Sequence, residues 1–568
     1  MIKKVILIVL AIVSANLVFG AGSADLVNNV DKLIASGKIA EAERQVDSAL
    51  VISPTDYKLM IAKGNVLMAK DDYTEALDYF EKALAEKSKD PDALYGAGMA
   101  ALKTDQADKS YDYFKRGEKT GKRKGDFLYG EALALEAQKK LADADATIRK
   151  AISKDKKNPL YHEALGNINY DKEVWAIAIS EYNQALDLDS SLTDLYYKLA
   201  RANFYSRNFT DAVKYYKIYL KQHDSDVKAW HELAQICVAA NNNAEAVFCY
   251  KKLTEIEPND GNNWYTLGDL EFTLNDYDGA AQALEKAISL NSNVAESYKR
   301  LAKIYQTKQE YYKADTAYTK YEEFVGAPTD PEYWFDKGKV MLKIGTKDAS
   351  FFNNAIVAFD KAISLDSTDA NYWEYAGLAR YYKQDYAGAI PFFLKRIELG
   401  TENVNALRNL AFCYLKTEQY DKAASTLEKA VALKPEDGVM RKMLGKIYVF
   451  LSGSKPDQKD VYINKAIPHL KAALQDTTGD LTAADKCEIR GDLGYCYVTL
   501  TDAKSAIPYL EKAIQCDPKN VDYLFNLASA YHYDNEIKLA HEYYGKVLEI
   551  DPNHKAAKEG YLRTQPRG

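Results

Sequence analysis

Residues 261–294 read GNNWYTLGDLEFTLNDYDGAAQALEKAISLNSNV, a stretch 34 residues long. Trp264, Leu267 and Gly268 lie at helical spacing and predict a first amphipathic helix. A polar turn follows, and small and apolar residues then continue at the same spacing, which predicts a second helix. Two such short helices cannot bury their apolar faces alone, so we expect them to stack on further copies of themselves.

The neighbouring blocks repeat these features with the same period. Regular blocks begin at positions 91, 125, 159, 193, 227, 261 and 295, and less regular ones begin near 23 and 57. Small residues at block positions 8 and 20 allow two helices to approach closely, while larger residues at positions 4, 7, 11 and 24 fill the space around the crossing. Prolines at position 32, such as Pro258 and Pro435, end the second helix because proline has no N–H donor.

This spacing resembles the tetratricopeptide repeat (TPR), and the resemblance covers residues 23–554. It implies an all-α fold, an α-solenoid with a right-handed superhelix of about fifteen helix-turn-helix units. We expect a regular array over 23–328 and a second array over 331–554. Residues 555–568 are predicted to form a capping helix and tail.

The second array contains two insertions, near 346–350 and 452–460, which delay the second helix of their blocks. The latter insertion, SGSKPDQKD, is polar and predicted to be a loop. Either a docking site or neutral drift of loop length explains the insertions, and drift is favoured.

Residues 1–20 have the pattern of a secretory signal peptide. Lys3 and Lys4 precede an apolar run, and small residues follow it. We expect cleavage after Gly20 or, alternatively, after Ala24, although an uncleaved membrane anchor is a further alternative. The apolar run is shorter than the roughly 20 residues of a membrane-spanning helix. No cysteine lies near the junction, so a lipid anchor is not predicted. The chain is therefore predicted to be exported, and periplasmic or outer-membrane-associated.

Composition and motifs argue against several classes of function. The formal net charge of −7 disfavours a nucleic-acid partner, which requires a basic face. The seven histidines show no metal-ligand spacing, and neither a phosphate-binding glycine loop nor a GxSxG motif occurs. We predict no catalytic, metal or cofactor site, no small-molecule ligand, and no enzymatic activity.

The six cysteines are interpreted mainly as small buried apolar residues. Cys237 and Cys249 occupy positions 11 and 23 of one block, on facing helices, and are the only pair singled out as a disulfide to test.

The TPR resemblance implies that positions 2, 5, 9 and 12 of each first helix face a concave groove that binds peptides or partner helices. The candidate groove residues are Tyr95, Tyr129, Tyr197, His231, Tyr265, Lys299, Lys303 and Phe335. One hypothesis is an aromatic ladder, because aromatic side chains offer large contact areas. The alternative is that the 44 tyrosines of the chain are spread by packing needs.

A basic cluster accompanies Lys299 and Lys303, with Arg300, Lys337 and Lys339 close by in the repeats. It is similar to the lysines of TPR proteins that clamp a C-terminal carboxylate. The paired lysine and asparagine residues of such clamps are not matched, so a solvated charged face is the preferred interpretation.

The chain is similar to exported envelope TPR proteins of Gram-negative bacteria, with a Bacteroidota-like composition. This resemblance implies a non-catalytic scaffold or adaptor that binds envelope proteins or peptides in its groove. The alternative is binding of glycan or peptidoglycan, with tyrosines stacking on sugar rings. No integral membrane span is expected after cleavage of the leader.

Overall fold

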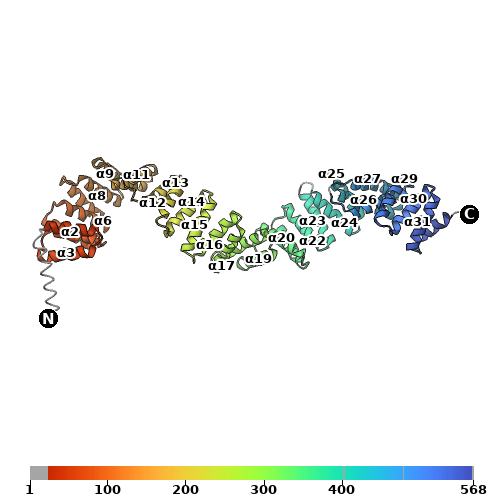
Figure 1. Cartoon of the computed structure of the whole chain (residues 1–568), viewed down its shortest axis with the longest axis horizontal. Helices are drawn as coiled ribbons and strands as arrows, with labels where there is room; N and C mark the ends of the chain where they lie inside the picture. The colour runs from red at the N-terminus through yellow and green to blue at the C-terminus, as the bar shows by residue number, and fades with distance from the viewer. Residues whose placement is uncertain (1–22, 401–402, 478, 566–568) are drawn as a thin grey trace, which may run out of the picture. The chain divides into compact units, whose positions relative to one another are not determined.

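The structure is a computed structural model that describes residues 23–400, 403–477 and 479–565. Within these ranges every regular element is helical and no β-strand occurs, which confirms the predicted all-α solenoid class. The predicted signal peptide, residues 1–20, lies outside the described residues. The chain divides into two compact units, Met1–Ser292 and Asn293–Gly568 (Figure 1).

The helices follow one another in antiparallel pairs. The first unit contains α2 (Ser23–Ala35), α3 (Ile39–Ile52), α4 (Tyr57–Met68), α5 (Tyr73–Glu86), α6 (Pro91–Lys103), α7 (Ala107–Glu118), α8 (Lys124–Ala137), α9 (Leu141–Lys154), α10 (Pro159–Asp171), α11 (Trp175–Leu188), α12 (Leu195–Tyr205), α13 (Phe209–Leu220), α14 (Val227–Ala239), α15 (Asn243–Ile256), α16 (Gly261–Thr273) and α17 (Tyr277–Ser289). The second unit contains α18 (Val294–Thr307), α19 (Tyr311–Val325), α20 (Pro331–Gly345), α21 (Phe351–Leu365), α22 (Ala370–Tyr382), α23 (Tyr386–Leu399), α24 (Val404–Lys416), α25 (Tyr420–Leu433), α26 (Gly438–Ser454), η1 (Pro456–Gln458), α27 (Lys459–Leu474), α28 (Ala483–Thr499), α29 (Ala503–Cys516), α30 (Val521–Tyr533), α31 (Ile537–Ile550) and α32 (Lys555–Arg563).

Local chemistry sets the turn between the two helices of a pair, as α16 and α17 illustrate. The backbone N–H of Asp276 donates to the carbonyl of Glu271 at 2.9 Å, across the left-handed residue Asn275, whose φ is 63°. This closes the carboxyl end of α16. The Asp276 carboxylate then accepts from the N–H of Gly279 at 3.1 Å and caps α17. One short sequence therefore ends one helix and begins the next.

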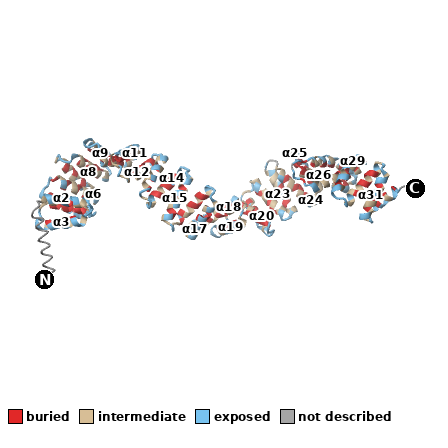
Figure 2. Ribbon diagram, in the orientation of Figure 1, coloured by how far each residue is buried: buried red, intermediate tan, exposed pale blue. Residues whose placement is uncertain are grey.

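Close helix crossings depend on glycine facing a large side chain. Phe114 of α7 is fully buried between Gly98 of α6 and Gly130 of α8. A Cβ atom at Gly98 or Gly130 would lie 2.6 or 2.4 Å from the Phe114 ring, closer than real contacts allow. Such crossings produce a buried interior along each unit (Figure 2).

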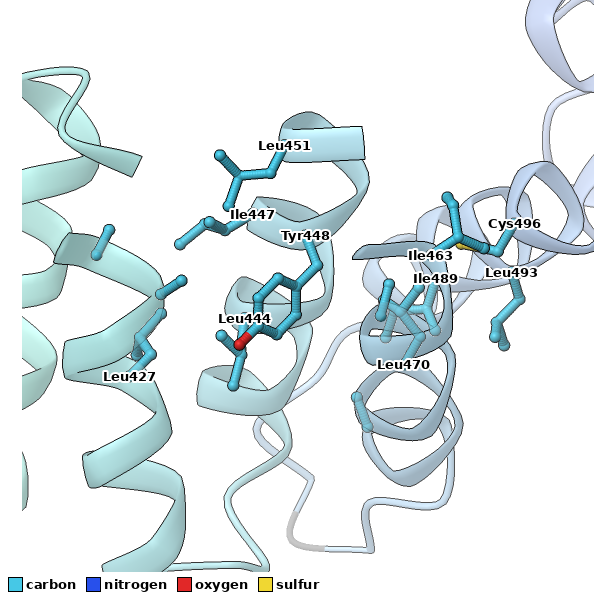
Figure 3. Packing of buried hydrophobic residues seen from close by; sticks show 14 of the residues in the cluster. Leu427, Leu444, Ile447, Tyr448, Leu451, Ile463, Leu470, Ile489, Leu493 and Cys496 are labelled. Carbon is cyan, nitrogen blue, oxygen red and sulfur yellow. The ribbon is translucent and has the colours of Figure 1, made fainter. Parts of the chain in front are cut away.

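The first helices of successive pairs contact one another as well as their own partners. Helix α8 contacts both α6 and α10 in the first unit, and α28 contacts α26 and α30 in the second. Around α26, Leu444 and Ile447 lie on the side of Leu427, and the interior continues through Leu470 to Leu493 of α28 (Figure 3). Within each unit, the first helices that contact one another in this way lie side by side in one layer.

The two insertions mainly lengthen helices. Helices α20 and α21 have 15 residues each, and α26 and α27 have 17 and 16. The loop predicted at 452–460 is wrong, because these residues continue α26, form η1 and begin α27. Buried Leu451 and Ser452 explain the extra helical turn, since both pack into the interior. The boundary between the predicted arrays, at 328–331, stays a prediction.

The interpretation of the six cysteines as buried apolar residues is confirmed for Cys237 and Cys249, whose disulfide, raised for testing, does not form, and it is wrong for Cys487 and Cys516. Cys237 and Cys249 are buried free thiols that fill the core of their helix pair. The structure instead joins Cys487 of α28 to Cys516, the last residue of α29, with their Cα atoms 6.2 Å apart. Two antiparallel helices bring the start of the first beside the end of the second, so these two cysteines meet.

Candidate functional site

A polar pocket lies on the layer of first helices in the first unit. It has a volume of about 310 Å³ and is lined by Glu136 of α8, Asn167, Tyr170 and Asp171 of α10, Tyr182 of α11, and Tyr197, Lys198 and Arg201 of α12. Glu136, Asn167, Tyr170, Tyr197 and Arg201 occupy positions 12, 9, 12, 5 and 9 of their blocks. These positions belong to the face that the TPR resemblance assigns to partners.

Most charges around this pocket already have a counter-charge. Lys198 lies 2.7 Å from Glu163, and Arg201 lies 3.7 Å from Glu232. Asp171 lies 3.4 Å from Lys139. These ion pairs fix the cationic side chains on the rim.

Glu136 differs, because within the described residues it forms neither a salt bridge nor a hydrogen bond with protein. Burial, and secondarily the carboxylate of Asp171, raises the pKa of Glu136 to about 7. The site therefore contains a carboxyl group that can change charge near neutral pH.

Two tyrosines add polar atoms to the pocket. Within the described residues, the hydroxyl groups of Tyr170 and Tyr197 are buried and form no hydrogen bond of ordinary geometry, although Tyr205 and Glu232, respectively, interact with them electrostatically. The guanidinium of Arg201 lies 5.7 and 5.8 Å from the centres of their rings, a cation–π arrangement. Burial raises the pKa of Tyr170 to about 12, so its hydroxyl stays protonated at neutral pH.

An apolar pocket of about 590 Å³ lies on the same type of face in the second unit. Its lining comes from Phe412 and Leu415 of α24, Tyr420 of α25, Val439, Lys442, Met443, Lys446, Ile447 and Phe450 of α26, Asp480 and Leu481 of the segment between α27 and α28, and Asp485 of α28. Phe412, Leu415, Val439, Lys442 and Lys446 occupy positions 9, 12, 2, 5 and 9 of their blocks. The same face of the repeat therefore forms both pockets.

Ion pairs fix one side of the apolar pocket, and an exposed aromatic side chain lies on the other side. Lys442 lies 2.6 Å from Asp485 and 2.5 Å from Glu488, which ties α26 to α28. Phe450 is 49% exposed, and its ring centre lies 4.1 Å from that of Tyr420. A large aromatic surface is thus available to a partner on a fixed frame.

Comparison with known proteins identifies the repeats. Sequence models described as "Tetratricopeptide repeat" match residues 29–91, 67–123, 197–260, 262–294, 380–447, 488–520 and 509–542. The chain belongs to the tetratricopeptide repeat family.

Individual TPR relatives match only in part. A TPR repeat-containing protein of Methanocaldococcus jannaschii is 25% identical over 191 residues, which cover 34% of this chain and 30% of that protein. A peroxisomal targeting signal receptor of Candida albicans is 23% identical, over 42% of this chain and 38% of the receptor. The chain thus spans well under half the length of these relatives.

Solved TPR structures are also similar to parts of the chain. YrrB, a TPR protein with an unusual peptide-binding site, is 24% identical and covers 36% of this chain and 98% of its own, with a TM-score of 0.31. The APC/C hetero-tetramer Cut9–Hcn1 is 15% identical and covers 91% of this chain and 98% of its own, with a TM-score of 0.28.

The tyrosines proposed as a ladder in the first unit are half-buried packing residues as well as surface residues. Tyr95 packs edge-on against Phe114, with ring centres 5.8 Å apart, and carries the Arg123 guanidinium on its ring. Tyr129 stacks on Tyr161, with ring centres 5.4 Å apart. A stabilising role therefore accounts for much of the ladder in this unit.

The remaining candidates of the first unit are also engaged. Tyr197 packs against Tyr216 and Tyr219 and lines the polar pocket. His231 lies 3.6 Å from Glu257. Tyr265 is half-buried on α16 and makes its own side-chain interactions.

In the second unit, the predicted basic cluster is largely neutralised. Lys303 lies 3.5 Å from Asp336, and Lys299 lies over the ring of Tyr321. Lys337 is buried and lies 2.6 Å from Glu322, so the interpretation as a solvated face is wrong for this residue.

Phe335 contributes to an aromatic cluster rather than to an open surface. Its ring centre lies 5.0 Å from that of Tyr372 and 5.1 Å from that of Tyr375. The ammonium group of Lys339 lies over the Phe335 ring, 4.6 Å from the ring centre.

The apolar pocket was not predicted from the sequence. The groove positions 2, 5, 9 and 12 that the TPR resemblance implies were sufficient to indicate it. The residues predicted from the sequence extend only to Phe335, whereas the pocket uses Phe412, Met443 and Phe450. No group of acidic, histidine or cysteine side chains suited to a metal ion occurs in the described ranges. No helix there is long and apolar enough to cross a membrane.

Proposed function

We propose that this chain is a non-catalytic scaffold that binds partner proteins or peptides on the face formed by its first helices. The observation that carries the proposal is the apolar pocket of α24 and α26, with half-exposed Phe450 at its edge. Contiguous exposed apolar surface is typical of sites where proteins bind one another. Aromatic side chains in such a site supply much of the binding energy.

The family membership supports the same function. TPR proteins commonly mediate protein–protein interactions, and two groups of relatives are named peroxisomal targeting signal receptors and peptidyl-prolyl cis-trans isomerases. By name, the receptors recognise a peroxisomal targeting signal. We carry over only the general role, binding of a protein segment by the repeats.

We further propose that the scaffold acts in the cell envelope of a Gram-negative bacterium. The predicted signal peptide supports this location. Amino-terminal sequencing of the protein purified from its native cells tests the proposal. A mature chain that begins at Ala21 or Asp25, recovered from the envelope fraction, is the expected result, and an unprocessed chain in the cytoplasmic fraction contradicts it.

Affinity capture after crosslinking in intact cells tests partner binding. We expect identified envelope proteins to be captured with the wild type and lost with Phe450→Ser. Val461→Ser is the matched control, because Val461 of the neighbouring helix α27 is similarly exposed, at 56% against 49%. Equal capture by all three proteins contradicts binding at this pocket.

The alternative function, binding of glycan or peptidoglycan, is separated by a glycan array. The scaffold proposal predicts no retained sugar. Specific retention of one glycan class, lost when the groove tyrosines are replaced, favours the alternative.

A further inference from the structure

The polar pocket of the first unit has one charged group without a counter-charge. Lys198, Arg201 and Asp171 each face an opposite charge outside the pocket, at 2.7, 3.7 and 3.4 Å. Glu136 lines the same pocket, and no described residue forms an ion pair or hydrogen bond with it. A positive group placed beside Glu136 would complete the charge balance of the pocket.

Two further polar side chains, Tyr170 and Tyr197, line the same pocket. The hydroxyl oxygens of Tyr170 and Tyr197 are buried and make no hydrogen bond of ordinary geometry in the described structure, although the phenol of Tyr205 and the carboxylate of Glu232, respectively, lie close enough to raise their pKa values. Buried polar groups are nearly always paired in native proteins, so an unpaired set at one pocket indicates a ligand that supplies several donors. Guanidinium and ammonium groups have several donors and a positive charge.

We propose that this pocket binds the arginine or lysine side chain of a partner segment, with the Glu136 carboxylate as its counter-ion and the Tyr170 and Tyr197 hydroxyls as acceptors. The proposal rests on the proposed function and assigns a chemical class to one contact of the partner. A volume of about 310 Å³ accommodates the end of a long basic side chain.

An anionic ligand fits the pocket less well. The carboxylates of Glu163 and Glu232 already neutralise Lys198 and Arg201. An added carboxylate or phosphate would also face Glu136 and Asp171, and like charges at short range are unfavourable. A cation gains the Glu136 carboxylate without breaking any of the existing pairs.

Binding is expected to depend on pH, because a cation requires ionised Glu136. The charged and titratable groups that face Glu136 are Asp171 of α10, Lys198 of α12, Lys139 after α8, and the phenols of Tyr129 on α8 itself and Tyr182 on α11. The pKa of Glu136 is about 7. Affinity for a cation should therefore rise from pH 6 to pH 8, whereas affinity for an anion should fall.

Fluorescence anisotropy with the full chain tests the assignment. The probes are rhodamine-labelled nine-residue peptides of glycine and serine, with a single central arginine, its uncharged analogue citrulline, or glutamate. We expect the arginine peptide to bind about tenfold tighter than the citrulline peptide at pH 8. We expect it to bind about tenfold tighter at pH 8 than at pH 6, since Glu136 ionises between these values.

Matched variants separate this site from non-specific attraction. Glu136→Gln should abolish both the preference for arginine and its dependence on pH. Glu75→Gln, which removes an equal charge at an exposed site in the same unit, should preserve both. The double variant Tyr170→Phe/Tyr197→Phe keeps the rings and should also weaken binding of the arginine peptide, while circular dichroism verifies that each variant is folded.

Three results would overturn the proposal: no binding of the arginine peptide, equal binding of arginine and citrulline, or tighter binding of the glutamate peptide at pH 6. Each of these results leaves the proposed scaffold function standing if partner capture still depends on Phe450. Loss of capture dependence on Phe450 would instead count against the scaffold function itself.

Discussion

Replacing Glu136 by glutamine should change how the stability of the first unit depends on pH. Its pKa is about 7 in the folded chain against an ordinary value of 4.5. The native state therefore binds this proton more tightly than the unfolded state, and stability falls as pH rises from 4.5 to 7. The difference between these pKa values corresponds to about 3 kcal/mol, which solvent near the pocket reduces to about 2 kcal/mol.

Hydrogen exchange measured by mass spectrometry provides the assay. A long repeat array unfolds locally rather than in one step, so a single free energy of unfolding is not defined for the whole chain. Exchange in α8 and α10, corrected for its intrinsic pH dependence, should accelerate between pH 5 and pH 8 in the wild type. In Glu136→Gln, the loss of protection between pH 5 and pH 8 should be smaller than in the wild type by the equivalent of about 2 kcal/mol.

The comparison between the two proteins removes the contributions of other titrating groups. If wild type and Glu136→Gln lose the same protection between pH 5 and pH 8, the carboxyl of Glu136 does not ionise at a raised pKa. The electrostatic description of the polar pocket would then be incorrect.

Three further predictions concern the frame that positions the pockets. The disulfide Cys487–Cys516 closes a segment with a sequence separation of 29, so its reduction should destabilise α28 and α29 by about 3 kcal/mol. Unchanged hydrogen exchange in these two helices after reduction would argue against the bond. Gly130→Ala should destabilise α7 and α8 by about 1–2 kcal/mol, because its Cβ meets the Phe114 ring at 2.4 Å, whereas increased protection would show that helix propensity outweighs the clash. Glu173→Gly should stabilise α10 and α11 by about 0.5–1 kcal/mol, since Glu173 has a φ of 60°, and a fall in the thermal midpoint would refute this relief of strain.

The 34-residue period was sufficient to predict the fold. Repeating small residues such as Gly98 and Gly130 determine where helices cross, and the turn at Asn275–Asp276 ends one helix and caps the next. These features act within one or two repeats, so they can be recognised in a single sequence.

The candidate site was only partly predictable for a physical reason. The groove positions 2, 5, 9 and 12 predict which face of a first helix is turned towards the groove. They do not predict which side chains of a neighbouring repeat cover that face, as Tyr129 stacked on Tyr161 and buried Lys337 show. The disulfide was predictable in principle, because Cys487 and Cys516 occupy positions 1 and 30 of one block, which an antiparallel pair brings together.

Site-specific photo-crosslinking in intact cells tests directly whether a partner binds at the apolar pocket. A photoreactive amino acid replaces Phe450 on the face of the first helices or, as a control, Val461 on α27, which is exposed to a similar degree. We expect a reproducible adduct with one envelope protein from position 450 and none from position 461. Adducts from position 461 alone, or the same adducts from both positions, would contradict partner binding at the apolar pocket.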